Sequence, residues 1–457
     1  MKNKPKILVH CYILKRLEDL ILFAKSIENQ FDILFIIYNS SYKEILNKHR
    51  CNYIYVYDYN KNGYIKSTIF KIYSSKILQK QLVKLRKYSI GQYLNEYVYM
   101  YRINYNIDIV QEIILNNNIR LCVTLTDMYL NFDNASFIKS AYDLKIPIVV
   151  PFLLEWNPES IISMISMIKY SSNYTLNLDS SKYQRNVFKK YKDQTYKQYY
   201  FYHAYQYKVL SQLGILSTKP WFNGGGASSL VAVADQYAYN EHVEMGINKN
   251  KLKIIGNISY VNLYNSFVNR KQLKKEIIKK YNLKYNRIII ICLTHWWEHG
   301  LSDKKTHWDI VHKTISATIK NRDNYSFFIT LHPSMDKKNY IFLEKQYNVK
   351  IFEERLMSVL PIADIYVVGQ SSTVPWAILC GIKTLMITFY KKIYLYDKLD
   401  SITYADSEQE IDNKLKYLLT NDIVFKNDWF LLSRDIVFTN KIANNYINEM
   451  KKLMHSE

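Results

Sequence analysis

Three groups of polar residues in the C-terminal half of the sequence each follow an apolar run that predicts a buried strand. The groups are Thr294–Gly300 (THWWEHG) after residues 287–293, His332-Pro333-Ser334 after residues 325–331, and Gly369–Thr373 (GQSST) after residues 365–368. The third group leads into a predicted helix that opens with Val374-Pro375-Trp376. Imidazoles, hydroxyls and the free N–H groups of a helix N-terminus bind anions, so the pattern indicates a phosphate or diphosphate site.

Each group also has a plain structural interpretation. Ser371, Ser372 and Thr373 are ordinary helix-capping residues, and His332 is equally consistent with a strand-end histidine bonded to a carbonyl. The groups nevertheless occur together at the carboxyl ends of strands in one predicted parallel sheet, which is where open α/β sheets bind ligands. We therefore predict that a phosphate-bearing ligand binds at His295, Glu298, His332, Ser371, Ser372 and Thr373.

Acidic and imidazole side chains follow predicted strands in the N-terminal half as well. Asp127 follows the strand 120–125, Glu155 follows the strand 146–152, and His10 lies in the first strand. A group transfer to a hydroxyl needs one such side chain to accept the hydroxyl proton. We rank Asp127 first as the catalytic base, then Glu155 and then His10, with a helix-cap or loop residue as the alternative for each.

The chain has only 11 glycines, and three of them are consecutive at Gly224, Gly225 and Gly226. Such a run lets the backbone approach a ligand closely, or it forms a hinge. The run lacks the G-x-G-x-x-G spacing, and there is neither a phosphate-loop lysine motif nor a D-x-D pair. We therefore expect no metal site and no cofactor, with a divalent metal ion as the alternative that no motif supports.

The elements that must position these residues alternate as strand and helix along most of the chain. This rhythm predicts an α/β fold of two Rossmann-like domains with parallel sheets that face each other across a cleft. We place an N-terminal domain at residues 1–261 and a C-terminal domain at residues 262–457. Basic helical insertions are expected near residues 64–118 and 157–213.

Composition restricts the class of protein further. The 457 residues carry a formal charge of +22 and are 48% hydrophobic, which excludes wholesale disorder. No apolar run reaches the ~18 residues that a membrane-spanning helix needs. The five cysteines form no C-x-x-C pair, which fits a reducing environment, so we expect a cytoplasmic location. Peripheral contact with the inner face of the membrane is a further expectation, which depends on the basic residues.

Basic residues form two stripes that suit an anionic partner. Lys76, Lys80, Lys84 and Lys87 share one helical face, and lysines alternate with tyrosines over residues 182–208. Such stripes fit the anionic inner leaflet, where lipid-linked acceptors lie. A solvated face in a lysine-rich protein is the alternative, and the lack of a recognisable binding module disfavours nucleic acid.

The order of these motifs resembles the GT-B superfamily over residues 229–390. Residues 231–235, the helix to Gly246 and residues 253–257 resemble the end of a GT-B N-terminal domain. Similar layouts occur in UDP-N-acetylglucosamine 2-epimerases, CDP-glycerol phosphotransferases and CMP-sialic-acid or Kdo transferases. In the last two groups an HP and a Ser-Ser motif contact the nucleotide phosphate, and these match His332-Pro333 and Ser371-Ser372.

The resemblance implies a metal-independent glycosyltransferase of the capsule or lipopolysaccharide type in a bacterium. Its donor would be a CMP-, CDP- or UDP-linked sugar, a nucleotide-sugar substrate that binds on the side of the C-terminal domain. Its acceptor would be an oligosaccharide or a lipid-linked chain on the side of the N-terminal domain. The sequence departs from the epimerases, because Pro375-Trp376 replaces their paired glutamates and Trp296-Trp297 replaces their arginines. A sugar-nucleotide 2-epimerase or hydrolase is therefore the alternative, and a non-enzymatic basic scaffold is the third hypothesis.

Overall fold

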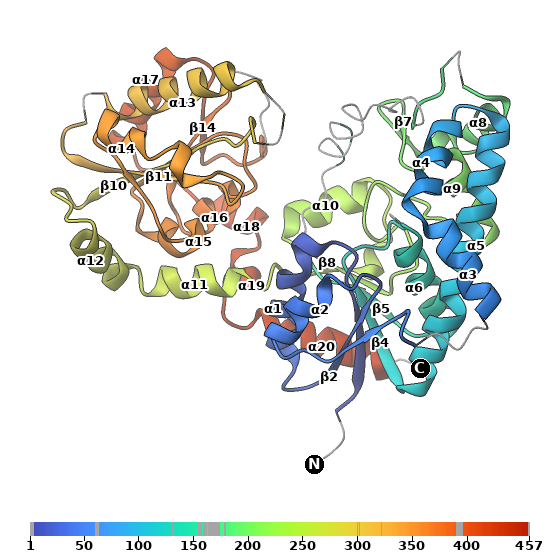
Figure 1. Ribbon diagram of the computed structural model, residues 1–457. Coiled ribbons are helices and arrows are strands. Elements are labelled where there is room, and N and C mark those ends of the chain that lie inside the picture. Colours follow the sequence, from blue (N-terminus) through green and yellow to red (C-terminus); the bar gives the residue numbers. More distant parts are fainter. Residues whose placement is uncertain are drawn as a thin grey trace. The chain divides into compact units, whose positions relative to one another are not determined.

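The computed structural model of the chain is an α/β structure whose residues group into two compact units (Figure 1). It describes residues 4–455, apart from residues 60–63, 130, 154–157, 159–161, 163–173, 178–179, 299, 301, 321 and 390–395. Unit 1 comprises residues 1–234, 238–258 and 442–457, and unit 2 comprises residues 235–237 and 259–441. Each unit is built around its own parallel sheet.

The sheet of unit 1 has the strand order β3-β2-β1-β4-β5-β8-β9, and all of its registered pairs are parallel. Its strands are β1 (Lys6–His10), β2 (Asp32–Ile37), β3 (Tyr53–Tyr55), β4 (Ile119–Thr124), β5 (Ile148–Val150), β8 (Leu230–Val233) and β9 (Leu252–Ile254). The strand order reverses between β1 and β4, so the carboxyl ends of these two strands form the topological switch point of the sheet.

Helices pack around this sheet and also form an extension at one side of unit 1 (Figure 1). The helices are α1 (Leu17–Ile27), α2 (Tyr42–Lys48), α3 (Tyr64–Ser74), α4 (Lys76–Leu85), α5 (Ser89–Asn116), α6 (Phe132–Asp143), α8 (Lys182–Lys190), α9 (Ala204–Gln212), α10 (Gln236–Glu244) and α20 (Ile442–His455). The extension consists of α3, α4, α5, α8 and α9, with a small hairpin of β6 (Thr195–Tyr196) and β7 (Tyr199–Tyr200). Its core is rich in buried aromatic rings, including Phe188 stacked on Tyr200.

Unit 2 contains the more regular Rossmann-like sheet, with the order β12-β11-β10-β13-β14-β15 and parallel pairs throughout. Its strands are β10 (Arg287–Cys292), β11 (Tyr325–Thr330), β12 (Lys350–Ile351), β13 (Ile365–Val368), β14 (Lys383–Ile387) and β15 (Ile402–Ala405). Its helices are α11 (Tyr260–Val268), α12 (Arg270–Lys280), α13 (Lys304–Ile319), α14 (Phe342–Tyr347), α15 (Leu356–Val359), α16 (Val374–Leu379), α17 (Glu408–Thr420), α18 (Lys426–Leu431) and α19 (Arg434–Val437). The central strand β10 is a run of buried isoleucines, as expected for a strand covered on both faces.

The C-terminal helix α20 departs from the expected division of the chain, because it belongs to unit 1 rather than to the second domain. It buries Ile442, Tyr446 and Met450 against unit 1. The Tyr446 hydroxyl donates to the carbonyl oxygen of Gly256 at 2.9 Å and accepts from the N–H of Phe152 at 3.0 Å. Apolar burial and these two long-range hydrogen bonds explain why the C-terminal end of the chain packs on unit 1. In the described part of the chain, no helix is both long and apolar enough to cross a bilayer.

Candidate functional site

The three polar groups of the C-terminal half lie side by side at one edge of the unit 2 sheet. The last registered pairs join Cys292 of β10 to Thr330 of β11 and to Val368 of β13. Neighbouring strands of a sheet lie about 4.8 Å apart, so the residues that follow these three strands start from adjacent positions. The strand order reverses between β10 and β13, so this edge is the switch point at which open α/β sheets bind ligands.

His295 and His332 stack on each other at this edge. Their ring centroids are 3.8 Å apart, and the ring planes differ by 15°. The backbone N–H of Ser334 donates to Nδ1 of His332 at 3.1 Å, so this nitrogen acts as an acceptor. In the neutral ring the proton is then on Nε2, which makes that nitrogen a hydrogen-bond donor suited to a phosphate oxygen.

The hydroxyls before α16 form a connected chain. Thr373 Oγ1 lies 2.6 Å from the Tyr366 hydroxyl and 2.8 Å from Ser371 Oγ. Burial raises the pKa of Tyr366 well above its ordinary value, so its phenol stays protonated. A proton order in which Tyr366 donates to Thr373 and Thr373 donates to Ser371 satisfies these oxygens. It leaves the Ser371 proton available to a ligand, and Ser372 next to it is exposed.

Among the described residues, only one of the two carboxylate oxygens of Glu298 has a hydrogen-bond partner. Its Oε1 accepts from the Tyr340 hydroxyl at 2.5 Å, and the same hydroxyl lies 2.8 Å from Nε2 of His307. Its Oε2 is buried and has no hydrogen-bond partner among the described residues. A buried oxygen in this state is unusual in a folded protein, and a ligand hydroxyl would satisfy it. Trp376, in the first turn of α16, presents no acceptor of this kind.

In unit 1, hydrogen-bond donors of the protein itself surround Asp127, as expected for the structural alternative to a catalytic base. The residue is fully buried, and its Oδ1 accepts from the N–H of Gly224 at 2.9 Å. Its Oδ2 accepts from the N–H groups of Gly226 and Ser228 at 3.1 and 3.3 Å, and from the Ser228 hydroxyl at 2.5 Å. Four donors thus occupy the carboxylate, which leaves little capacity to take a proton from a substrate.

The other two candidate bases of the N-terminal half differ in what the structure shows. His10 is fully buried at the end of β1, where its ring stacks on Phe137 at a centroid distance of 4.8 Å. Burial lowers the pKa of His10 to about 3, so the imidazole is neutral near physiological pH. Glu155 lies outside the described residues.

A carboxylate that the sequence analysis did not single out, Asp133, lies in the first turn of α6, which follows β4. Burial raises the pKa of the Asp133 carboxyl to about 7, and the nearby Arg102 guanidinium opposes this rise. The residue keeps part of its surface exposed, which moderates the effect of burial. Asn106 Nδ2 donates to Asp133 Oδ1 at 3.3 Å. A carboxyl that titrates near neutrality is suited to acid–base chemistry.

Several polar atoms around Asp133 are buried without a partner among the described residues. They are His10 Nε2, Asn106 Oδ1, Asn134 Oδ1 and Arg102 Nε. Buried polar atoms are rarely left unsatisfied, so this buried polar cluster indicates a place where hydroxyls of a ligand or water bind. Its members come from β1, α5 and the start of α6, close to the switch point of the unit 1 sheet. The one local signal in the sequence that could point to this cluster is Asn131, which caps the start of α6 through its side chain.

The glycine run lies neither among the polar residues at the edge of the unit 2 sheet nor in the buried polar cluster of unit 1. Gly224, Gly225 and Gly226 pack against Asp127 and line a separate pocket of unit 1. In the part of the chain that the structure describes, no group of three or more histidine, cysteine or acidic side chains could hold a metal ion.

Comparison with solved structures identifies the architecture. A glycosyltransferase from Rickettsia africae matches over 100% of both chains, with a TM-score of 0.53 and 12% identity. A UDP-GlcNAc 2-epimerase from Neisseria meningitidis, bound to UDP-GlcNAc, matches over 98% of this chain and 99% of its own, with a TM-score of 0.51 and 12% identity. The UDP-GlcNAc 2-epimerase from Methanocaldococcus jannaschii covers the same shares, with a TM-score of 0.51 and 11% identity.

These likenesses, at such low identity, show the fold. The chain has the GT-B fold, which confirms the α/β class and the two Rossmann-like domains with parallel sheets that the sequence predicts. It is similar in structure both to a glycosyltransferase and to UDP-GlcNAc 2-epimerases. No family model matches the sequence, and no curated protein matches it.

Proposed function

We propose that this chain is a GT-B glycosyltransferase that transfers a sugar from a nucleotide-activated donor to a hydroxyl of an oligosaccharide or lipid-linked acceptor, in the synthesis of a bacterial surface polysaccharide. One observation carries the proposal. At the switch point of unit 2, a histidine with its proton on Nε2 and a chain of hydroxyls that ends at Ser371 follow neighbouring strands. Both groups donate hydrogen bonds, as a phosphate-binding site requires.

The donor would bind through unit 2. His332, Ser371, Ser372 and Thr373 bind the phosphates, and His295 supports the His332 ring by stacking. The partnerless Oε2 of Glu298 accepts from a hydroxyl of the ribose or of the transferred sugar. The same donors stabilise the negative charge that develops on the leaving nucleotide as the bond from the anomeric carbon to the phosphate oxygen breaks.

The acceptor would bind at the buried polar cluster of unit 1, with Asp133 as the base. Asp133 takes the proton of the acceptor hydroxyl while the hydroxyl oxygen attacks the anomeric carbon, and the nucleotide leaves with the bonding electrons. Its pKa of about 7 suits this exchange near neutral pH. Asp127, which ranked first from sequence, instead positions the glycine run.

Binding of nucleotides to the purified chain tests the donor site. We expect one of CMP, CDP, UDP and GDP to raise the melting temperature, because a ligand at about 100 times its Kd adds ~2.7 kcal/mol of stability. Incubation of the matching nucleotide-sugar with an oligosaccharide acceptor should then release the nucleotide in step with acceptor consumption. A chain that none of the four nucleotides stabilises would contradict the proposal.

A sugar-nucleotide 2-epimerase or hydrolase is the second candidate, since two of the compared structures are UDP-GlcNAc 2-epimerases. Such an enzyme converts UDP-GlcNAc to a new sugar species without any acceptor, whereas a transferase requires the acceptor. Incubation with UDP-GlcNAc alone, followed by NMR of the sugar, separates the two functions.

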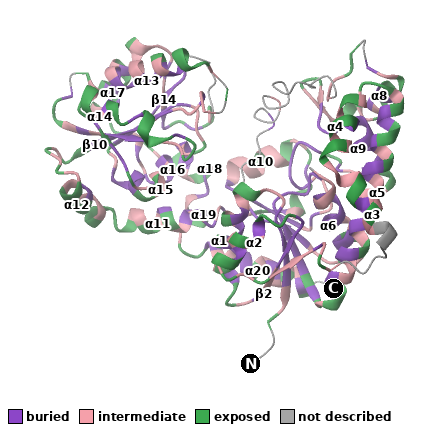
Figure 2. Ribbon diagram, in the orientation of Figure 1, coloured by how far each residue is buried: buried purple, intermediate pink, exposed green. Residues whose placement is uncertain are grey.

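The extension of unit 1 supports contact with an anionic membrane. Residues 59–95 contain eight lysines and arginines and no acidic residue. Lys76, Lys80 and Lys84 are exposed on α4 and Ile77 is 78% exposed, whereas Leu82 is buried. Figure 2 shows exposed residues along the extension that contains α4. Exposed lysines around an exposed apolar side chain suit an anionic lipid surface. Such contact would bring the enzyme to a lipid-linked acceptor.

A further inference from the structure

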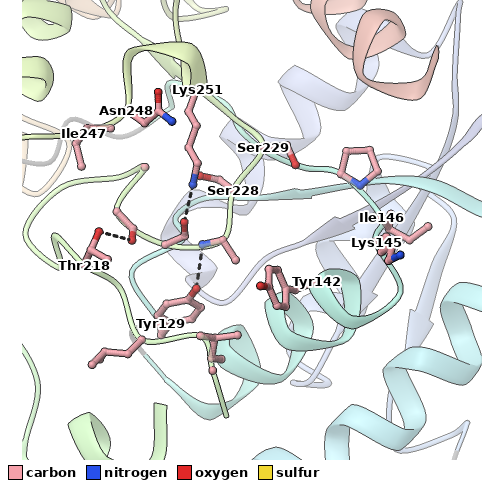
Figure 3. A pocket seen from close by; sticks show the side chains of 18 of the residues that line it. Tyr129, Tyr142, Lys145, Ile146, Thr218, Ser228, Ser229, Ile247, Asn248 and Lys251 are labelled. Carbon is pink, nitrogen blue, oxygen red and sulfur yellow. Dashed lines mark hydrogen bonds between the residues drawn. The ribbon is translucent and has the colours of Figure 1, made fainter. Parts of the chain in front are cut away.

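Unit 1 contains a pocket of about 810 Å³ that the proposed function does not use (Figure 3). Three of its walls come from segments that lead into strands: Lys145–Pro147 precedes β5, Ser229 precedes β8 and Lys251 precedes β9. None of the residues of the buried polar cluster lines this pocket. Its volume falls within the ~300–1,000 Å³ that small-molecule sites occupy.

The glycine run forms a further wall of the pocket, and close packing accounts for its composition. A Cβ atom added to Gly225 would lie 2.5 Å from the carbonyl oxygen of Lys219, and one on Gly226 would collide with the carbonyl oxygen of Asp127. Gly224 has a φ of +96°, which side chains rarely adopt. Close packing and backbone conformation therefore require glycine at these three consecutive positions of the pocket wall.

Hydrogen bonds hold this wall from two sides. Asp127 binds the N–H groups of Gly224 and Gly226 from within the protein. On the pocket side, Lys251 Nζ donates to the Gly226 oxygen at 2.9 Å, and the Thr218 hydroxyl donates to the Gly225 oxygen at 3.3 Å (Figure 3). The Thr218 N–H donates to the same Gly225 oxygen at 2.9 Å. The wall is therefore formed before a ligand arrives, which lowers the entropic cost of binding.

The charges around the pocket are positive. Lys145 and Lys251 line it, and the Lys219 ammonium lies 3.4 Å from the position of a Cβ atom on Gly246, another lining residue. The described lining residues include no aspartate or glutamate. Three ammonium groups without a carboxylate among the lining residues attract an anion.

The remaining lining groups suit a carbohydrate. Ser229, Thr218 and Asn248 provide hydroxyl and amide groups, which pair with sugar hydroxyls. Tyr142 is 52% exposed and supplies an aromatic surface on which the C–H face of a sugar ring can pack. From the charge, the polar groups and the preformed wall together, we infer that this pocket binds an anionic carbohydrate of the sugar-phosphate class.

Calorimetric titration of the full-length chain with glucose 6-phosphate tests this inference. We expect saturable binding, at least tenfold weaker binding of glucose or inorganic phosphate alone, and a loss of about tenfold in affinity in Lys145→Gln. Lys253→Gln is the matched control, because it removes the same charge from an exposed residue of β9 that does not line the pocket. This control should bind glucose 6-phosphate like the unmodified chain.

Each of the other outcomes would overturn the inference. Unchanged affinity in both Lys145→Gln and Lys251→Gln would show that the pocket is not the site. Equal affinity for inorganic phosphate would show a simple anion site without carbohydrate recognition. Weaker binding of glucose 6-phosphate in Ser371→Ala would place the ligand at the donor site of unit 2. The titration does not depend on catalysis, so failure of the proposed function would leave its result interpretable.

Discussion

The imidazole rings of His295 and His332 stack at a centroid distance of 3.8 Å, although 37 residues of sequence separate them. One ring follows β10 and the other follows β11, so the parallel pairing of these strands brings them together. Ser334 fixes the tautomer of His332 and thereby makes Nε2 a donor. This pair is the centre of the proposed donor site.

Removal of the phosphate donors should weaken nucleotide binding. We expect His332→Ala and Ser371→Ala each to weaken the affinity for the stabilising nucleotide about tenfold or more, because each deletes a hydrogen bond to a charged group. Calorimetric titration measures this loss. His455→Ala removes an exposed imidazole outside unit 2 and should have no effect. Intact binding in both site variants would refute the donor site.

Replacement of the proposed base should slow turnover without weakening donor binding. For Asp133→Asn we expect kcat to fall about 10²–10⁴-fold, the usual contribution of a general base, with an unchanged nucleotide Kd. The base must be ionised, so the rate of the unmodified enzyme should rise with pH through about 7. The variant should lack this rise. A variant that keeps the full rate, or the same pH dependence, would exclude Asp133 as the base.

Asp127→Asn should act through stability rather than through the chemical step. An amide nitrogen in place of one carboxylate oxygen would face the N–H groups of the glycine run, so bonds would be lost and a donor left buried. We expect unit 1 to lose about 3 kcal/mol of unfolding free energy. Hydrogen exchange of unit 1 amides measures this loss without assuming that the two units unfold together. Native stability combined with a collapse of kcat would instead restore Asp127 as the base.

The lysines of α4 should govern binding to anionic lipid. The triple variant Lys76→Gln, Lys80→Gln and Lys84→Gln should bind phosphatidylglycerol vesicles about 100-fold more weakly, at ~1 kcal/mol per lysine. A matched control on α12 replaces Lys271, Lys275 and Lys279, which are exposed and have the same spacing. Sedimentation with vesicles compares the two. Equal losses in both variants, or equal binding to neutral phosphatidylcholine, would argue against a specific docking surface.

Local sequence patterns are enough to predict the alternation of strands and helices. The isoleucine run of β10, the capped starts of helices and the polar groups after β10, β11 and β13 are local patterns, and the structure reproduces them. These patterns were sufficient for the fold class and for the neighbouring positions of the unit 2 groups, because parallel strands of one sheet end at one edge.

The surroundings of the two acids that follow β4 depend on residues that are distant in the sequence. Asp127 and Asp133 lie six residues apart after the same strand, and nothing local distinguishes them. The Asp127 carboxylate accepts hydrogen bonds from residues 224–228, about a hundred positions away in the sequence. The pKa of Asp133 instead depends on burial and on the charge of Arg102. The return of α20 to unit 1 likewise rests on contacts of Tyr446 with Phe152 and Gly256. Availability and burial depend on long-range contacts, which no local pattern contains.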